Sequence, residues 1–190
     1  MDTPFVKFGE WFDLAQKSEK EPTAMCLATV DTDCRPSARI VLLKSFDERG
    51  FVFHTNESSR KGRDLLHSPD SALCFYWTSI DKQVRIEGKV ERTTDKEADE
   101  YFATRPRLSQ IGAWASKQSS PLAHAEELDI RFAKYQKKFG DGKIPRPPFW
   151  GGYRLRARSI EFWSRREFRL HEREVFYKKN GEWRYTLLFP

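Results

Sequence analysis

The chain has 190 residues, 38% of them hydrophobic and 14% aromatic, with a formal net charge of +6. A chain of this length buries roughly 70% of the surface that it exposes when unfolded, so we expect one self-supporting domain without a stabilising disulfide framework. The three cysteines lack CxxC spacing, which argues against a disulfide-rich protein. The sequence has no run of eighteen apolar residues and no basic segment leading into an apolar one, which argues against a membrane-spanning or secreted protein. We therefore expect a soluble cytoplasmic protein.

The basic excess indicates anionic partners, but scattered surface lysines would give the same total. The positions of the basic residues must therefore decide between a binding site and a solvated surface.

An amphipathic helix is predicted at the start of the chain, over residues 5–18, with Phe5, Phe8, Trp11 and Phe12 on one face. Pro22 marks its end. We therefore expect an N-terminal helical segment over residues 1–21, followed by a main domain over residues 22–190.

The main domain begins with a series of β-like runs. These cover residues 23–30, 37–44, 51–55, 71–77 and 83–93. Turn-like sequences separate these runs, and the sequence TSID, which ends at Asp81, lies between the last two. This order predicts an antiparallel meander.

Helices and further strands complete the prediction. Helical patterns cover residues 58–68, 93–106 and 122–140, and β-like runs cover 153–163, 168–179 and 182–189. Asn180-Gly181 joins the last two runs and is a strong hairpin signal. Antiparallel strands interrupted by helices predict an α+β domain built on a small β-barrel.

Residues 55–66, TNESSRKGRDLL, have the features of a phosphate site. Ser58 or Ser59 would cap a helix, and the positive end of a helix dipole favours an anion by about 0.3–1 kcal/mol. Arg60 and Lys61 add two charge-assisted donors. The alternative is an ordinary serine cap with solvated basic residues, but basic residues in a first turn oppose the dipole unless an anion is bound.

Two predicted strands carry polar residues, and the alternation of side chains does not by itself show what these residues do. Arg39 and Lys44 bracket an apolar run and fall on opposite faces, so they reach one ligand only if the strand bends or presents its end. Gln83 and Arg85 share one face of a half-buried strand, where Gln83 offers both a donor and an acceptor.

Residues 101–120 are rich in side chains that bind phosphates and rings, although helix ends and surface polarity produce similar compositions. The candidates are Tyr101, Arg105, Ser109, Gln118 and Ser119. The four histidines lack metal-ligand spacing, and no GxSxG or Walker sequence occurs. We therefore expect neither a metal site nor a nucleophilic serine.

Residues 161–177 place Arg169, His171 and Arg173 at alternate positions. In a strand these three side chains would share one face. We expect an anionic group opposite that face.

Taken in order, these segments resemble the pyridoxine (pyridoxamine) 5′-phosphate oxidase family over about residues 22–190. The matching motifs are RIVLLK, TNESSRK, QVRIEGKVER, YFATRPRLSQIGAWASKQSS, PPFWGGYRL, IEFW and RLHER. The chain departs from the family pattern at Glu172, where Asp is usual, in its LLFP tail, and in the basic run before Arg169, where a glycine-containing turn is expected.

The resemblance implies a homodimeric split-barrel enzyme with FMN partly across the subunit interface. The FMN contacts that it implies are Arg39, Ile40, Val41, Leu42, Lys44, Thr55, Ser59, Arg60, Lys61, Gln83, Arg85, Gln118, Ser119, Trp163 and Arg173. The implied substrate contacts are Lys44, Tyr101, Arg105, Ser109, Arg169 and His171, of which Arg169 and His171 would be catalytic.

The implied reaction is the FMN-dependent oxidation of pyridoxamine or pyridoxine 5′-phosphate to pyridoxal 5′-phosphate by O2, in vitamin B6 metabolism. The alternatives are a split-barrel oxidase of another ring compound, such as a phenazine precursor, and a ligand-binding module without turnover. A nucleic-acid-binding protein would need one continuous basic stripe in place of basic residues that converge on pockets.

Overall fold

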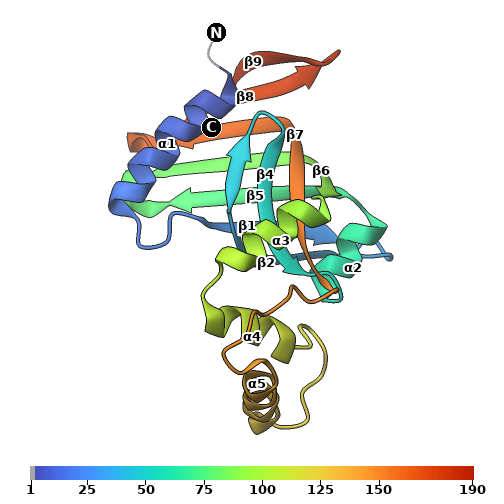
Figure 1. Cartoon of the computed structure of the whole chain (residues 1–190). Coiled ribbons are helices and arrows are strands. Elements are labelled where there is room, and N and C mark those ends of the chain that lie inside the picture. The colour runs from blue at the N-terminus through green and yellow to red at the C-terminus, as the bar shows by residue number, and fades with distance from the viewer. Residues whose placement is uncertain (1–2) are drawn as a thin grey trace.

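The computed structural model describes residues 3–190 and shows one curled antiparallel sheet with helices around it (Figure 1). Within this range the sheet has nine strands in the order β2-β1-β5-β6-β7-β4-β3, with β8 paired to β7 and β9 to β8. The strands are β1 Ala24–Val30, β2 Pro36–Leu42, β3 Ser45–Asp47, β4 Gly50–Asn56, β5 Asp70–Trp77, β6 Lys82–Arg92, β7 Trp150–Ser164, β8 Glu172–Lys179 and β9 Glu182–Leu188. This is the predicted α+β split barrel.

Strand β7 connects the two parts of the sheet. Its first half pairs with β4, its second half pairs with β8, and β6 runs along nearly its whole length. The β6–β7 register shifts between Glu87 and Gly88. A Cβ atom at Gly88 would lie 2.1 Å from the Arg156 carbonyl oxygen, so this close approach of two backbones requires glycine.

The predicted N-terminal helix is present as α1, Pro4–Ser18, and it packs against the barrel. Thr3 caps it, and Pro4 stands at its first turn, where a missing N–H costs nothing. Phe8 and Trp11 belong to the same core cluster as strand residues Phe51 and Phe75. The apolar stripe of α1 thus closes one side of the barrel.

The remaining helices are α2 Arg60–His67, α3 Asp95–Thr104, α4 Arg107–Ala115 and α5 Glu126–Phe139. Helix α4 was not predicted, because Pro106 interrupts the pattern; Pro106 is in fact its N-cap. Helices α4 and α5 lie together beyond the sheet (Figure 1). A second core cluster containing Phe102, Ile111 and Trp150 joins this helical part to the start of β7.

Two predictions near the C-terminus had different outcomes. The Asn180-Gly181 hairpin is confirmed, with both residues at positive φ. The strand predicted over residues 168–179 is present only from Glu172 onward, because Ser164 pairs with Glu172 and the chain must reverse between them. Residues Glu167–Arg169 form a 3-10 turn with positive φ at Phe168 and Arg169.

That reversal also corrects the expected arrangement of the basic residues. Arg169 and His171 precede β8, and only Arg173 lies within it. The three side chains therefore do not share a strand face.

None of the helices in residues 3–190 is long and apolar enough to cross a membrane.

Candidate functional site

A cavity of about 660 Å³ opens between the sheet and helices α2, α3 and α4. The predicted ligand-binding residues in its wall are Ile40, Val41, Leu42, Lys44, Thr55, Lys61, Tyr101, Arg105, Ser109 and Gln118. The wall thus gathers residues from both halves of the sequence.

The other predicted residues are not part of the wall. Arg39, Arg60 and Ser119 are chain neighbours of lining residues, and Ser59 lies two residues before the lining residue Lys61. Gln83, Arg85, Trp163, Arg169, His171 and Arg173 come from β6, β7, β8 and the turn before β8.

One end of the cavity is formed by the start of helix α2. Ser59 is fully buried and caps the helix, accepting a hydrogen bond from the Gly62 N–H. The Lys61 ammonium donates to Gln118 Oε1 at 2.8 Å and to the hydroxyls of Thr55 and Ser59 at 3.3 Å. Burial, together with the nearby charge of Arg39, lowers the pKa of Lys61. No carboxylate pairs with this ammonium among the described residues, which favours an anionic ligand.

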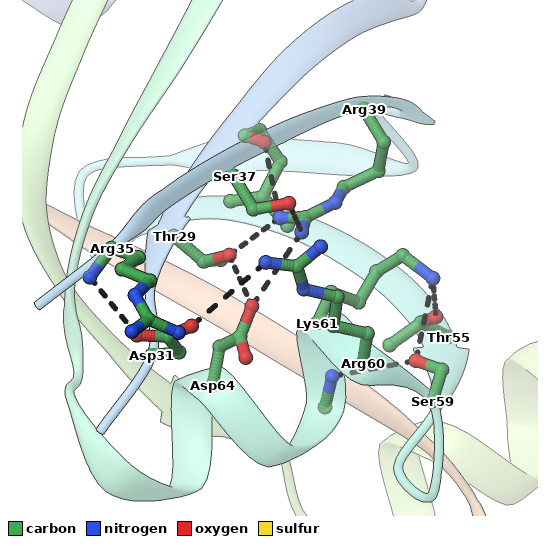
Figure 2. Close-up of polar contacts among 12 residues, drawn as sticks. Thr29, Asp31, Arg35, Ser37, Arg39, Thr55, Ser59, Arg60, Lys61 and Asp64 are labelled. Atoms are coloured by element: carbon green, nitrogen blue, oxygen red, sulfur yellow. Dashed lines mark hydrogen bonds and ion pairs between the residues drawn. The ribbon is translucent and has the colours of Figure 1, made fainter. Parts of the chain in front are cut away.

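Arg39 lies beside this end of the cavity in a polar network (Figure 2). Its guanidinium donates to Thr29 Oγ1 at 2.6 Å and to Ser37 Oγ at 2.9 Å, and it lies 3.5 Å from Asp64. Arg60 is more exposed and approaches Asp31 at 3.9 Å.

The other end of the cavity holds a second group of basic and hydroxyl side chains. Arg105 lies between α3 and α4, with its guanidinium carbon 5.0 Å from the Trp150 ring centroid. Its Nη1 is buried and has no hydrogen-bond partner within residues 3–190, and burial lowers the pKa of Arg105. The Lys44 ammonium lies 5.9 Å from the Tyr101 ring centroid, and Ser109 stands on the adjacent turn of α4. A buried donor left unpaired is costly, so this arrangement suits a second anion.

His54 lines the cavity and was not among the predicted residues. Its ring lies nearly parallel to those of Tyr101 and Trp150, with centroids 4.3 Å and 4.9 Å away, and neither ring nitrogen has a hydrogen-bond partner among the described residues. Burial, followed by the charges of Lys44 and Arg105, lowers its pKa to about 4. The imidazole is therefore neutral near pH 7. Its position beside Thr55 was the only sequence signal for a role in this site.

Gln83, Trp163 and Arg173 form a row across three neighbouring strands. The register pairs Gln83 with Trp163 and Trp163 with Arg173. Arg173 donates to both carboxylate oxygens of the buried Glu161, at 2.9 and 3.1 Å, and Arg85 lies 3.5 Å from the same carboxylate. Glu161 was not predicted, because it fell within an ordinary strand pattern.

The turn before β8 positions His171 beside this row. The His171 and Trp163 ring centroids are 4.6 Å apart, and His171 Nδ1 accepts a hydrogen bond from the Arg166 backbone N–H. Arg169 is exposed in the turn. The sheet and this turn therefore bring Trp163, His171 and Arg173 together as a group outside the cavity wall.

In chemical terms the cavity offers two separate basic groups joined by apolar and aromatic walls. Residues 3–190 contain no cluster of three or more His, Cys, Asp or Glu side chains suited to a metal ion. The donor set suits a ligand or ligand pair with two anionic groups and flat rings.

Comparisons with known proteins agree with this geometry. Residues 13–139 match the family model described as pyridoxamine 5′-phosphate oxidase, and residues 150–190 match the pyridoxine 5′-phosphate oxidase C-terminal dimerisation region. A pyridoxine/pyridoxamine 5′-phosphate oxidase of Myxococcus xanthus (strain DK1622) is 53% identical over 98% of this chain and 91% of its own length.

Two solved structures share the fold. The crystal structure of PhzG from Burkholderia lata 383, in complex with tetrahydrophenazine-1-carboxylic acid, superposes with a TM-score of 0.94 at 31% identity, covering 100% of this chain and 94% of that one. A pyridoxamine 5′-phosphate oxidase-related, FMN-binding protein from Nostoc punctiforme PCC 73102 superposes with a TM-score of 0.79 at 15% identity, covering both chains fully. The family models, the identity and the cavity agree: this chain belongs to the pyridoxamine 5′-phosphate oxidase family.

Proposed function

We propose that this protein is an FMN-dependent oxidase that converts pyridoxamine or pyridoxine 5′-phosphate to pyridoxal 5′-phosphate. O2 accepts the two electrons and two protons and forms H2O2, and with the amine substrate water supplies the aldehyde oxygen and NH3 is released. The observation that carries the proposal is the pair of basic groups, around Lys61 and around Arg105, in one cavity. FMN and the substrate each carry one phosphate monoester, of about −1.5 to −2 charge near neutral pH.

The residues near α2 fit the phosphate of FMN. The helix begins with two basic residues, which oppose its dipole, and Lys61 is partly desolvated without a carboxylate partner. A bound phosphate would relieve both costs. Ile40, Val41 and Leu42 supply an apolar wall from β2 for the remainder of the cofactor.

The residues at the other end fit the substrate phosphate. Arg105 offers a planar fork with one buried, unpaired nitrogen, and Lys44 adds a second charge. Tyr101 and Ser109 contribute hydroxyls from neighbouring helices.

A homodimer would complete the site. In one chain the row containing Gln83, Trp163 and Arg173 is not part of the cavity wall, although the family resemblance assigns these residues to the same ligands. The dimerisation region at residues 150–190 includes Trp163, Arg169, His171 and Arg173. We therefore place this row of one protomer against the cavity of its partner, with FMN at the interface, in a cytoplasmic enzyme.

The protein's own contribution to catalysis is orientation. FMN, when bound, supplies the acceptor for the two electrons that leave the substrate. Lys44 and Arg105 fix the substrate phosphate, and Arg169 and His171 hold the pyridine ring, so that its C4′ carbon is held in one orientation. The neutral His54 ring lies against both Tyr101 and Trp150 beside the proposed phosphate site.

The test is anaerobic reduction of the bound flavin. The FMN-loaded protein is mixed with pyridoxine 5′-phosphate, and the visible flavin absorption is followed. Bleaching with formation of the aldehyde is the expected result. If FMN binds but stays oxidised with both pyridoxine and pyridoxamine 5′-phosphate, the proposed oxidase activity is wrong.

A second candidate substrate class is suggested by the likeness to PhzG, which was crystallised with a reduced phenazine carboxylic acid. Such a ligand carries a carboxylate and no phosphate. Flavin bleaching with a tetrahydrophenazine carboxylic acid but not with pyridoxine 5′-phosphate would favour this alternative. The lower identity, 31% against 53%, and the basic group around Arg105 favour the phosphorylated pyridine.

A further inference from the structure

Asp64 is a buried carboxylate beside the proposed FMN phosphate site, and neither the sequence nor the proposed function gives it a role. It lies on the side of α2 that faces β1 and β2, and its side chain is 5% exposed. A buried carboxylate requires a charged or hydrogen-bonding partner. Its partners are Arg39 and Thr29 (Figure 2).

The Thr29 hydroxyl connects the acid to the arginine. It donates to Asp64 Oδ2 at 2.7 Å and accepts from Arg39 Nη1 at 2.6 Å. Ser37 Oγ and the Leu27 carbonyl oxygen accept further hydrogen bonds from the same guanidinium. Acceptors on three sides therefore hold the guanidinium in one orientation.

This restraint matters because Arg39 and Lys61 carry like charges close together. The charge of Arg39 contributes to the lowered pKa of Lys61, after burial. Arg39 stands on β2, an edge strand among the described strands, from which a long side chain could turn into solvent. Asp64 is the carboxylate that holds it inward against the repulsion from Lys61.

We propose that Asp64 is a positioning residue for the cofactor phosphate: it fixes the Arg39 guanidinium beside Lys61, so that the two charges act on the same phosphate group. This inference rests on the proposed function, in which FMN binds at the start of α2. Thr29 transmits the restraint from the carboxylate to the guanidinium.

For Asp64→Asn, the proposal predicts a change in FMN affinity opposite to the one that simple electrostatics predicts. Asp64→Asn removes a negative charge near an anion site, and charge alone would then tighten phosphate binding. Loss of the restraint on Arg39 would weaken it. The direction of the change therefore separates a positioning role from a long-range charge effect.

The experiment compares FMN with riboflavin, which lacks the phosphate. Each ligand is titrated into the full-length apoprotein, and its dissociation constant is measured by quenching of flavin fluorescence. We expect Asp64→Asn to raise the Kd of FMN by about tenfold, the equivalent of part of one charge-assisted hydrogen bond. The Kd of riboflavin should stay unchanged. Asp70→Asn, which removes an equal charge from a half-exposed site on β5, is the control and should change neither constant.

The outcomes distinguish a failure of the proposed function from a failure of the proposed role of Asp64. If the unmodified protein binds FMN no better than riboflavin, the proposed function fails. If it prefers FMN but Asp64→Asn binds FMN equally or more tightly, only the role of Asp64 is overturned. An equal loss for FMN and riboflavin also overturns it, because a merely structural defect would affect both ligands.

A second variant covers the case in which Asp64→Asn does not fold, as judged by circular dichroism. Thr29→Val keeps the side-chain volume and both charges but removes the connecting hydroxyl. We expect Thr29→Val to weaken the binding of FMN and to leave the binding of riboflavin unchanged. An unchanged Kd for FMN in this variant would refute the proposal.

Discussion

Replacing Arg105 with lysine keeps the charge of the proposed substrate site and removes its geometry. The Arg105 guanidinium is held over Trp150 with Nη1 buried and unpaired, so a phosphate oxygen can become its partner. A hydrogen bond to a charged group is worth about 1.5–3 kcal/mol, and lysine cannot reproduce the planar fork. We therefore expect Arg105→Lys to raise the KM for pyridoxine 5′-phosphate roughly 10- to 150-fold.

The assay is steady-state oxidation at saturating FMN, together with an FMN titration of the apoprotein. The matched control is Arg107→Lys, because Arg107 lies two residues away and donates to the backbone carbonyl oxygens of Gly140 and Gly142, outside the cavity. An unchanged KM in Arg105→Lys would refute the argument from fork geometry. An equal weakening of FMN binding would show that Arg105 serves the cofactor instead.

Three further predictions concern histidines and a buried acid. His171→Asn should retain FMN and much of the activity if His171 positions the substrate ring; complete loss of turnover with FMN still bound would instead establish an essential proton acceptor. For His54, the lowered pKa of about 4 means that unfolding takes up a proton as the pH falls from about 6.5 to about 4, so stability declines in that window. His54→Phe should remove that part of the decline. If urea denaturation shows that both proteins lose the same free energy of unfolding between pH 7 and pH 5, the prediction is wrong. Glu161→Gln leaves Arg173 without its buried partner and should lower the free energy of unfolding by about 3 kcal/mol. The control is Glu87→Gln, which alters a more exposed acid beside Arg85. If urea denaturation shows that Glu161→Gln loses no more free energy of unfolding than this control, the value is too high.

The start of α2 shows how much local sequence can predict. The serine cap predicted the helix correctly, because capping acts within one turn, whereas binding of a phosphate by Arg60 and Lys61 stays a prediction. Asp64 and Thr29 could not be connected in this way. Their contact joins residues 35 positions apart and exists only because β1 packs beside α2.

The C-terminal region shows the limit of strand periodicity. Alternation predicted one face for Arg169, His171 and Arg173, but a period-two pattern does not reveal where an antiparallel partner forces the chain to reverse. The pairing of Ser164 with Glu172 decided that, and it moved Arg169 and His171 into a turn.

By itself, the sequence determined the local features of this protein: the amphipathic helix α1, most strands, the Asn180-Gly181 hairpin and the ordered motifs of its family. These depend on side-chain period, capping and turn chemistry, which act over a few residues. Only the tertiary structure decided that Lys44 and Arg105 share a cavity with Lys61, that His54 lies in an aromatic stack, and that Glu161 holds Arg173. Those relations follow from sheet register and helix packing, which bring distant segments together and which no local pattern encodes.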